Sequence, residues 1–258
     1  MRGLTLGEGN VVETLEYPFM AGVTARELRP RFPRAWPTTH TFGATLIHPQ
    51  WLLSSAHGSR ERAVRLNTQA LRAPGGLILD VEEVFCHVNY DDLTQENDIA
   101  LLRLGSPGAV GVTPVEFAKD PSWRGEAGSL FSVGWGRDGA NGFDGLLRER
   151  LVTLFDQGTC RSMFAKSSGL VSESDFCTVS PMDAAGDGDS GGPILHRRAD
   201  GRLVQVGVIS ESFLNPGLPD KCVDVAQYAP WISQVMQGNR NVSKPVPFGT
   251  ASRAGRPG

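Results

Sequence analysis

The chain has 258 residues, of which 40% are hydrophobic and 21% are charged, and its formal net charge is −3. This balance predicts a globular protein with enough apolar side chains for one compound domain or two small ones. It excludes the basic surface that draws whole proteins onto nucleic acid or anionic lipid, and no apolar run approaches the roughly 20 residues that span a bilayer. We therefore expect no nucleic-acid partner and no membrane partner.

The chain begins with two segments that do not look like regular structure. Residues 1–16 lack the charged start and apolar centre of a secretory signal, and we expect a separate N-terminal segment there, a candidate activation region. Residues 24–37 contain four arginines among prolines and a tryptophan, which favours an extended, exposed loop. This Arg-rich loop either contacts a substrate or partner or is a solvated surface loop.

Short strands are expected more often than helices in the rest of the chain. Segments rich in β-branched and apolar residues alternate with turns drawn from 31 Gly and 17 Pro, a pattern typical of antiparallel sandwiches and barrels. The expected strands lie at 45–47, 51–53, 77–88, 99–104, 130–133, 146–155 and 203–209. A helix is expected at 157–164, and a second one at 225–237, where apolar residues recur at helical spacing. Residues 238–258 carry basic but no acidic side chains among many Gly, Pro, Ser and Asn, which predicts a disordered basic tail.

The stretch Gly188–Pro193 reads Gly-Asp-Ser-Gly-Gly-Pro, a setting suited to a nucleophilic serine. A serine hydroxyl needs a base to take its proton and donors to receive the oxyanion. His57 ends an apolar strand in a run of small residues, which places an imidazole at a sheet edge. Asp98 begins a strongly hydrophobic strand, where a carboxylate either caps a turn or accepts a hydrogen bond from a group such as a histidine.

Together, His57, Asp98 and Ser190 follow the chain order of the chymotrypsin-like enzymes, and the chain resembles a divergent, bacterial-type member of the trypsin-like serine proteases. The resemblance covers about 17–237, and its motifs are Trp51–His57, Asn97–Leu102, Gly134–Gly136, Gly188–Pro193 and Tyr228–Ile232. It implies an all-β peptidase domain of two six-stranded antiparallel β-barrels with a C-terminal helix. Barrel one would cover about 17–115, barrel two about 116–228, and the helix about 225–237.

The resemblance also implies catalytic roles. His57 would act as general base and then general acid, Asp98 would orient its imidazole, and the backbone N–H groups of Gly188 and Ser190 would form the oxyanion hole. Asp189 would be structural, because in such relatives this carboxylate binds the ammonium of a newly cut N-terminus.

The activation event is not identified by the sequence. No Ile-Val-Gly-Gly start follows a basic residue, and Leu6-Gly7 lies near the expected position with Thr5 before it.

The residues that correspond to the substrate pocket depart from trypsin. Ala184 stands at the pocket floor, where trypsin has an aspartate, and the wall is Ser210, Glu211 and Ser212, which implies a more polar and narrower mouth. Asp220 corresponds to a second floor position. Its carboxylate either binds a cationic substrate side chain or is a solvated turn residue after a proline.

Four cysteines are too few for a disulfide framework and lack the close pairing of a zinc site. The resemblance implies one disulfide, between Cys160 and Cys177, and leaves Cys86 and Cys222 as buried free thiols. Phe42 and Gly58 stand where the family has a bridge beside the histidine, so packing would replace that bridge. This usage fits an intracellular bacterial protease or a secreted enzyme whose signal was removed.

The resulting expectation is a serine endopeptidase that cleaves polypeptides through an acyl-enzyme intermediate. The alternatives are a catalytically silent, protease-like binding protein and an esterase that uses the same triad. No cofactor is needed, and no metal is expected, because the loop between Asn67 and Gly76 lacks the clustered acids that calcium requires. The natural substrate and the oligomeric state stay open.

Overall fold

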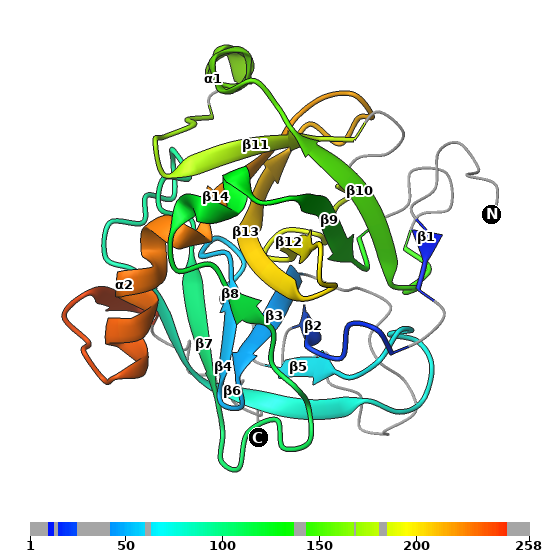
Figure 1. Ribbon diagram of the computed structural model, residues 1–258. Helices are drawn as coiled ribbons and strands as arrows, with labels where there is room; N and C mark the ends of the chain where they lie inside the picture. The colour runs from blue at the N-terminus through cyan, green and yellow to red at the C-terminus, as the bar shows by residue number, and fades with distance from the viewer. Residues whose placement is uncertain are drawn as a thin grey trace, which may run out of the picture.

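The computed structural model describes residues 10–12, 15–24, 42–59, 63–136, 143–167, 169–180 and 185–246. In these residues the chain forms two closed antiparallel β-barrels, drawn one above the other in Figure 1, with few helices. The predicted fold class is confirmed. The Arg-rich loop from residue 25 onward, Leu6-Gly7 and Ala184 lie outside the described residues.

Barrel one is built from the first half of the chain. Its strands are β2 (Met20–Thr24), β3 (Phe42–His48), β4 (Trp51–Ser54), β5 (Ala63–Leu66), β6 (Leu77–His87) and β7 (Ala100–Leu104). The order β6-β5-β2-β3-β4-β7 closes because β6 also pairs with β7. Their apolar side chains, such as Leu46, Leu52 and Leu101, are fully buried and supply the driving force for closure.

Barrel two uses the second half. Its strands are β9 (Gly128–Gly134), β10 (Arg148–Leu154), β11 (Asp175–Val179), β12 (Pro193–Arg198), β13 (Leu203–Ser212) and β14 (Asp220–Asp224). The order β10-β11-β14-β13-β12-β9 closes through the pairing of β9 with β10. The linker between the barrels carries β8 (Glu116–Phe117), which pairs in parallel with β13, and a short 3₁₀ turn at Pro121–Gly125.

Each end of the described chain pairs with the barrel of the opposite half. The short strand β1 (Asn10–Val11) lies along β10, and β15 (Ser243–Pro245) lies along β6. The expectation of disorder beyond Gly238 is therefore wrong for residues 238–246. The backbone of this segment finds partners on the open edge of β6, and the indole of Trp231 donates to the carbonyl of Val242 over 2.9 Å.

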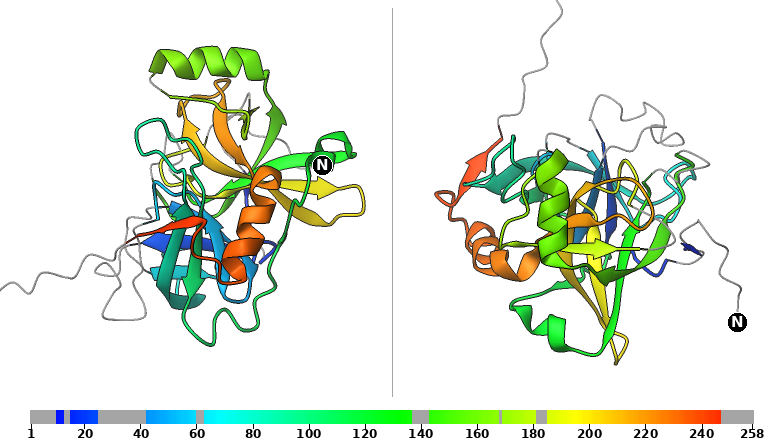
Figure 2. Two further views of the ribbon diagram at one scale, coloured as in Figure 1. Left: turned by 90° about the vertical axis from the view of Figure 1, so that its left-hand side faces the viewer. Right: turned by 90° about the horizontal axis from the view of Figure 1, so that it is seen from above.

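Two helices flank the barrels (Figure 2). Helix α1 (Gln157–Phe164) lies at the outer end of barrel two, and its N-terminus is capped by Asp156, which accepts from the Thr159 N–H. A short 3₁₀ turn over Ala165–Ser167 extends it. Helix α2 (Val225–Met236) buries Tyr228, Trp231 and Ile232 against the barrels. No helix in the described segments is long and apolar enough to span a membrane.

Candidate active site

His57 and Asp98 meet because the strands that precede and follow them are neighbours. Ser54 at the end of β4 pairs with Ala100 at the start of β7, so the residues just outside both strands share one edge of barrel one. His57 Nδ1 lies 2.7 Å from Asp98 Oδ2, and the His57 backbone N–H donates to Asp98 Oδ1 over 2.9 Å. A carboxylate at Nδ1 favours the tautomer with the proton there, which leaves the Nε2 lone pair free to accept. Asp98 is thus a histidine partner and not only a turn cap.

A third donor to Asp98 comes from barrel two. The Ser210 hydroxyl donates to Asp98 Oδ2 over 2.6 Å, and Asp98 is fully buried. Together with His57, this bond satisfies a carboxylate that would otherwise be costly to bury. The sequence placed Ser210 on the pocket wall and gave no sign of this contact, because the two residues are 112 positions apart.

Ser190 lies on a tight turn whose glycines are required by their surroundings. Gly188 and Gly191 have φ of +96° and +78°, in the left-handed region that favours glycine. A Cβ on Gly191 would lie 2.4 Å from both the Gly43 carbonyl and the Ser54 hydroxyl, so this turn packs directly against barrel one. The Ser190 carbonyl accepts from the Gly43 N–H over 2.8 Å.

The same contacts bring Ser190 to the side of barrel one that carries His57. Phe42, next to Gly43, packs edge-on against the His57 ring with centroids 5.3 Å apart. The Phe42 ring also fills the space over Gly58, where a Cβ would lie 2.2 Å from a ring carbon. Packing therefore stands where the family has a disulfide beside the histidine.

Asp189 is buried beneath the serine turn. Its Oδ1 accepts from the Gly136 N–H over 2.8 Å, its Oδ2 accepts from the Gly186 N–H over 2.8 Å, and Oδ2 also lies 3.0 Å from the guanidinium of Arg150. A Cβ on Gly134 or Gly136 would lie 2.0 or 2.3 Å from atoms of this carboxylate. The Gly-Trp-Gly motif thus makes room for Asp189.

The predicted pocket residues Ser212 and Asp220 are cross-strand partners at the ends of β13 and β14. Asp220 is only 4% exposed, and within the described part of the chain its Oδ1 has no hydrogen-bond partner. Burial raises the pKa of Asp220 to about 6, and the Ser212 hydroxyl and the backbone of Ala185 oppose that rise only in part. Asp220 is therefore a buried group and not a solvated turn residue.

Glu211, the other predicted wall residue, forms an ion pair that the sequence did not suggest. Its Oε2 lies 2.5 Å from the Nζ of Lys221, which is fully buried on β14. Lys221 Nζ also donates to the carbonyls of Gln95 and Leu170, at 3.3 and 3.1 Å. One buried ammonium thus joins a barrel-one loop, a barrel-two loop and the wall strand.

The cysteines behave as the resemblance implies. Cys160 and Cys177 form a disulfide that joins α1 to β11, and Cys86 and Cys222 are free and buried. Burial raises the pKa of the Cys222 thiol, which keeps it protonated and unreactive.

The side chain of Arg65 occupies the loop between Asn67 and Gly76. Arg65, on β5, donates to the carbonyls of Leu71, Ala73 and Gly75. These are the kind of oxygens that a cation would otherwise gather. Among the described residues no group of three or more His, Cys, Asp or Glu side chains could hold a metal ion.

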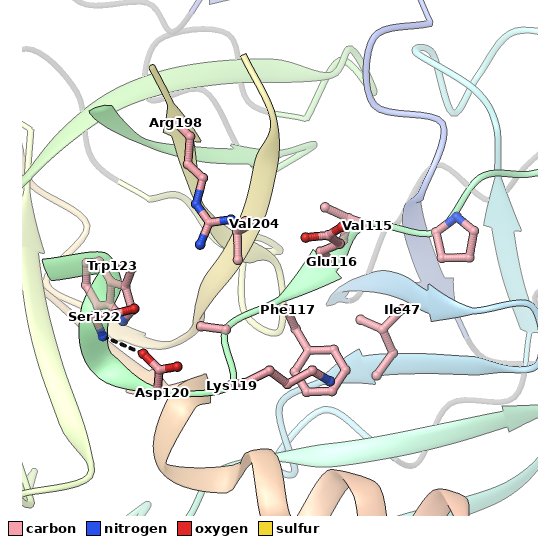
Figure 3. Close-up of a pocket in the computed structure, with 12 residues that line it drawn as sticks. Ile47, Val115, Glu116, Phe117, Lys119, Asp120, Ser122, Trp123, Arg198 and Val204 are labelled. Carbon is pink, nitrogen blue, oxygen red and sulfur yellow. Dashed lines mark hydrogen bonds between the residues drawn. The ribbon is translucent and has the colours of Figure 1, made fainter. Parts of the chain in front are cut away.

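A cavity of about 460 Å³ lies away from these residues, between the linker and the β12–β13 hairpin (Figure 3). It is lined by Phe117, Lys119 and Trp123 of the linker region, by Arg198 at the far end of β12 from Ser190, and by Ile47 at the far end of β3 from Phe42. None of the predicted site residues lines it.

Comparison with known proteins agrees with this arrangement. Vitamin K-dependent protein C of Rattus norvegicus is 32% identical over 80% of this chain and 48% of its own length, so the chain spans about half of that relative. Trypsin Blo t 3 of Blomia tropicalis is 28% identical, and the match covers 76% of this chain and 77% of that protein. Cationic trypsin-3 of Rattus norvegicus is 29% identical, and the match covers 78% of this chain and 81% of that protein. A sequence model of the family Trypsin matches residues 7–232. The chain belongs to the trypsin family of serine endopeptidases.

Proposed function

We propose that this chain hydrolyses peptide bonds through an acyl-enzyme intermediate on Ser190. His57 takes the Ser190 proton at Nε2 as the hydroxyl attacks the substrate carbonyl, and returns it to the departing amine; Asp98 holds the imidazole and stabilises its charged form. The observation that carries the proposal is the buried Asp98 carboxylate, which accepts from His57 and Ser210 beside a serine turn bonded to Gly43.

The backbone N–H groups of Gly188 and Ser190 receive the oxyanion in this mechanism. The positive φ of Gly188 supports the assignment, because it lets the two neighbouring N–H groups turn toward one point. Losing one such donor typically costs about 3 kcal/mol in the barrier.

We assign Asp220 to recognition of a cationic substrate side chain. Its buried Oδ1, which lacks a hydrogen-bond partner among the described residues, can be satisfied by an incoming guanidinium or ammonium. The pairing of Asp220 with Ser212 supports a position beside the wall strand β13. Polypeptides with Lys or Arg before the cleaved bond are therefore the expected substrates.

A fluorophosphonate probe tests the catalytic proposal. We expect stoichiometric labelling of the wild-type chain and none of Ser190→Ala or His57→Ala. Ser162→Ala, on the exposed side of α1, is a matched control and should label like the wild type. A folded wild-type protein that takes no label before or after limited proteolysis is a binding protein, and turnover of esters without peptides assigns an esterase instead.

A peptide-library profile tests the assignment of Asp220. Asp220→Asn keeps the shape of the side chain and removes its charge, so we expect selectivity for basic residues to fall by roughly tenfold or more. Fluorophosphonate labelling should persist in the variant, since the probe does not need the pocket charge. A wild-type profile without basic preference contradicts the assignment.

A further inference from the structure

The serine turn is tied to the protein core through one buried carboxylate. Asp189 is 1% exposed, and each of its oxygens is engaged, Oδ1 by the Gly136 N–H and Oδ2 by the Gly186 N–H and Arg150. The residue lies between Gly188 and Ser190 in the chain. The contacts of its side chain therefore anchor the segment that carries both proposed oxyanion donors.

Arg150 reaches this carboxylate from within barrel two. It lies in β10, opposite Ser132 of β9, and its side chain is 2% exposed. Side chains alternate along a strand, so Arg148 and Arg150 face the interior while Glu149 faces outward to Tyr17 and Arg197. Arg148 has its own partner in Asp144, at 2.7 Å, so the two buried arginines of β10 serve different carboxylates.

We infer that Arg150 is the permanent counter-ion of Asp189 and positions the serine turn without any contribution from a cut N-terminus. The inference rests on the proposed catalytic role of Ser190. A compensating charge stabilises a buried carboxylate, and here an internal guanidinium of barrel two supplies it. Arg150 touches no substrate, so it is a positioning residue.

The contacts of Asp189 also argue against a second cation. Oδ2 already holds a guanidinium and an amide N–H, and the glycines at 134 and 136 are packed against the carboxylate closely enough to exclude a Cβ. An N-terminal ammonium would have to share the carboxylate with Arg150 or displace it, and a displaced Arg150 would be a buried charge without its carboxylate. The geometry thus favours a chain that is able to catalyse the reaction without cleavage of its N-terminal segment.

Chemical rescue tests the role of Arg150. In Arg150→Ala, we expect the rate of inactivation by a fluorophosphonate to fall by about a hundredfold or more, the loss typical of a damaged oxyanion hole. Free guanidinium ion at millimolar concentration should restore part of this rate, and Arg150→Lys should retain part of it. The loss should appear in kcat more than in KM.

Arg148→Ala is the matched control, because it removes a buried arginine of the same strand and face that pairs with Asp144. It should lower thermal stability but keep the inactivation rate near that of the wild type, with no response to guanidinium. If both variants lose the same activity and neither is rescued, Arg150 has only a structural role and the inference is wrong. An Arg150→Ala variant with wild-type rates overturns it as well.

The second arm concerns the N-terminus. A full chain carrying an uncleavable N-terminal extension, checked for integrity by mass spectrometry, should react with the probe as fast as a chain cut before Leu6. Activity that appears only after the cut overturns the inference. Absence of labelling in every form of the wild-type chain would instead reject the proposed function, so the two failures are distinguishable.

Discussion

Three buried carboxylates near the junction differ in how their charge is compensated. Asp98 accepts from a histidine and a serine, Asp189 is paired with Arg150, and Asp220 keeps one oxygen without a hydrogen bond among the described residues. The three side chains are all carboxylates, so the groups that surround each one determine its role. Of the three, Asp220 is the one to which we assign a new cationic partner.

The raised pKa of Asp220 makes cation binding depend on pH. The ionised carboxylate binds a cation and the protonated one does not, so affinity for p-aminobenzamidine should approach its full value well above the pKa of about 6 and fall by up to about tenfold per pH unit below it. Fluorescence titration of the Ser190→Ala protein measures this without turnover. The Asp220→Asn variant should bind p-aminobenzamidine weakly at every pH. A wild-type affinity that stays constant over roughly three pH units around the pKa, from about pH 4 to about pH 7, contradicts the prediction.

At the scale of elements, Arg65 organises the loop between β5 and β6. Its guanidinium donates to three backbone carbonyls of that loop, at Leu71, Ala73 and Gly75. The guanidinium of Arg65 therefore takes the place that a bound metal cation could occupy in this loop. Its hydrogen bonds to the carbonyls explain how the loop folds with few acidic side chains.

Replacing Arg65 should weaken the protein. In Arg65→Met the loop carbonyls lose their donors, and we expect the free energy of unfolding to fall by about 2–4 kcal/mol, measured by urea denaturation. Arg72→Met, on the exposed side of the same loop, should change it by about 0.5 kcal/mol or less. Equal losses in the two variants would show that Arg65 is not the organising group.

Among the strands that the sequence did not predict, β14 has buried charges that break the apolar pattern. Residues 220–224 read Asp-Lys-Cys-Val-Asp, which is typical of a surface loop, yet all are buried in β14. Two of these charges are compensated by residues of other elements, Lys221 by Glu211 of β13 and Asp224 by Arg124 of the linker region. By contrast, all seven predicted strands, the helix at 157–164 and the terminal helix follow from local apolar periodicity and are confirmed.

The candidate site likewise contains residues that the sequence predicted and contacts that it could not predict. Motif and chain order sufficed to propose His57, Asp98 and Ser190, because each stands in a distinctive local pattern. Ser210 on Asp98 and Arg150 on Asp189 could not be predicted, since a hydrogen bond across 112 or 39 residues leaves no local signal. Only the register of closed barrels brings such residues together.

At the scale of the whole molecule, each end of the described chain pairs with the barrel formed by the opposite half of the chain. β1 extends the sheet of barrel two and β15 that of barrel one, as Figure 1 shows for β1 beside β10. Each barrel is thus stabilised by residues from the far end of the chain. The two barrels are expected to unfold together.

Removing β15 should therefore destabilise more than a tail would. Truncation after Gly238 leaves the buried Trp231 N–H without the Val242 carbonyl and removes the pairing with β6, so we expect a loss of about 1–3 kcal/mol in the free energy of unfolding. Removal of residues 247–258 alone, where a disordered tail remains the prediction, should leave stability unchanged. Calorimetry of the two truncated proteins compares them, and identical melting curves would contradict the role of β15.

Because Phe42 packs over Gly58, the region beside His57 does not depend on disulfide formation. Reduction of the chain's disulfide would free α1 from β11 at the outer end of barrel two, whereas the backbone around His57 contains no sulfur bond to lose. The loop beside His57 thus holds its shape without a disulfide that a reductant could break, and an excess of dithiothreitol would act on the outer end of barrel two.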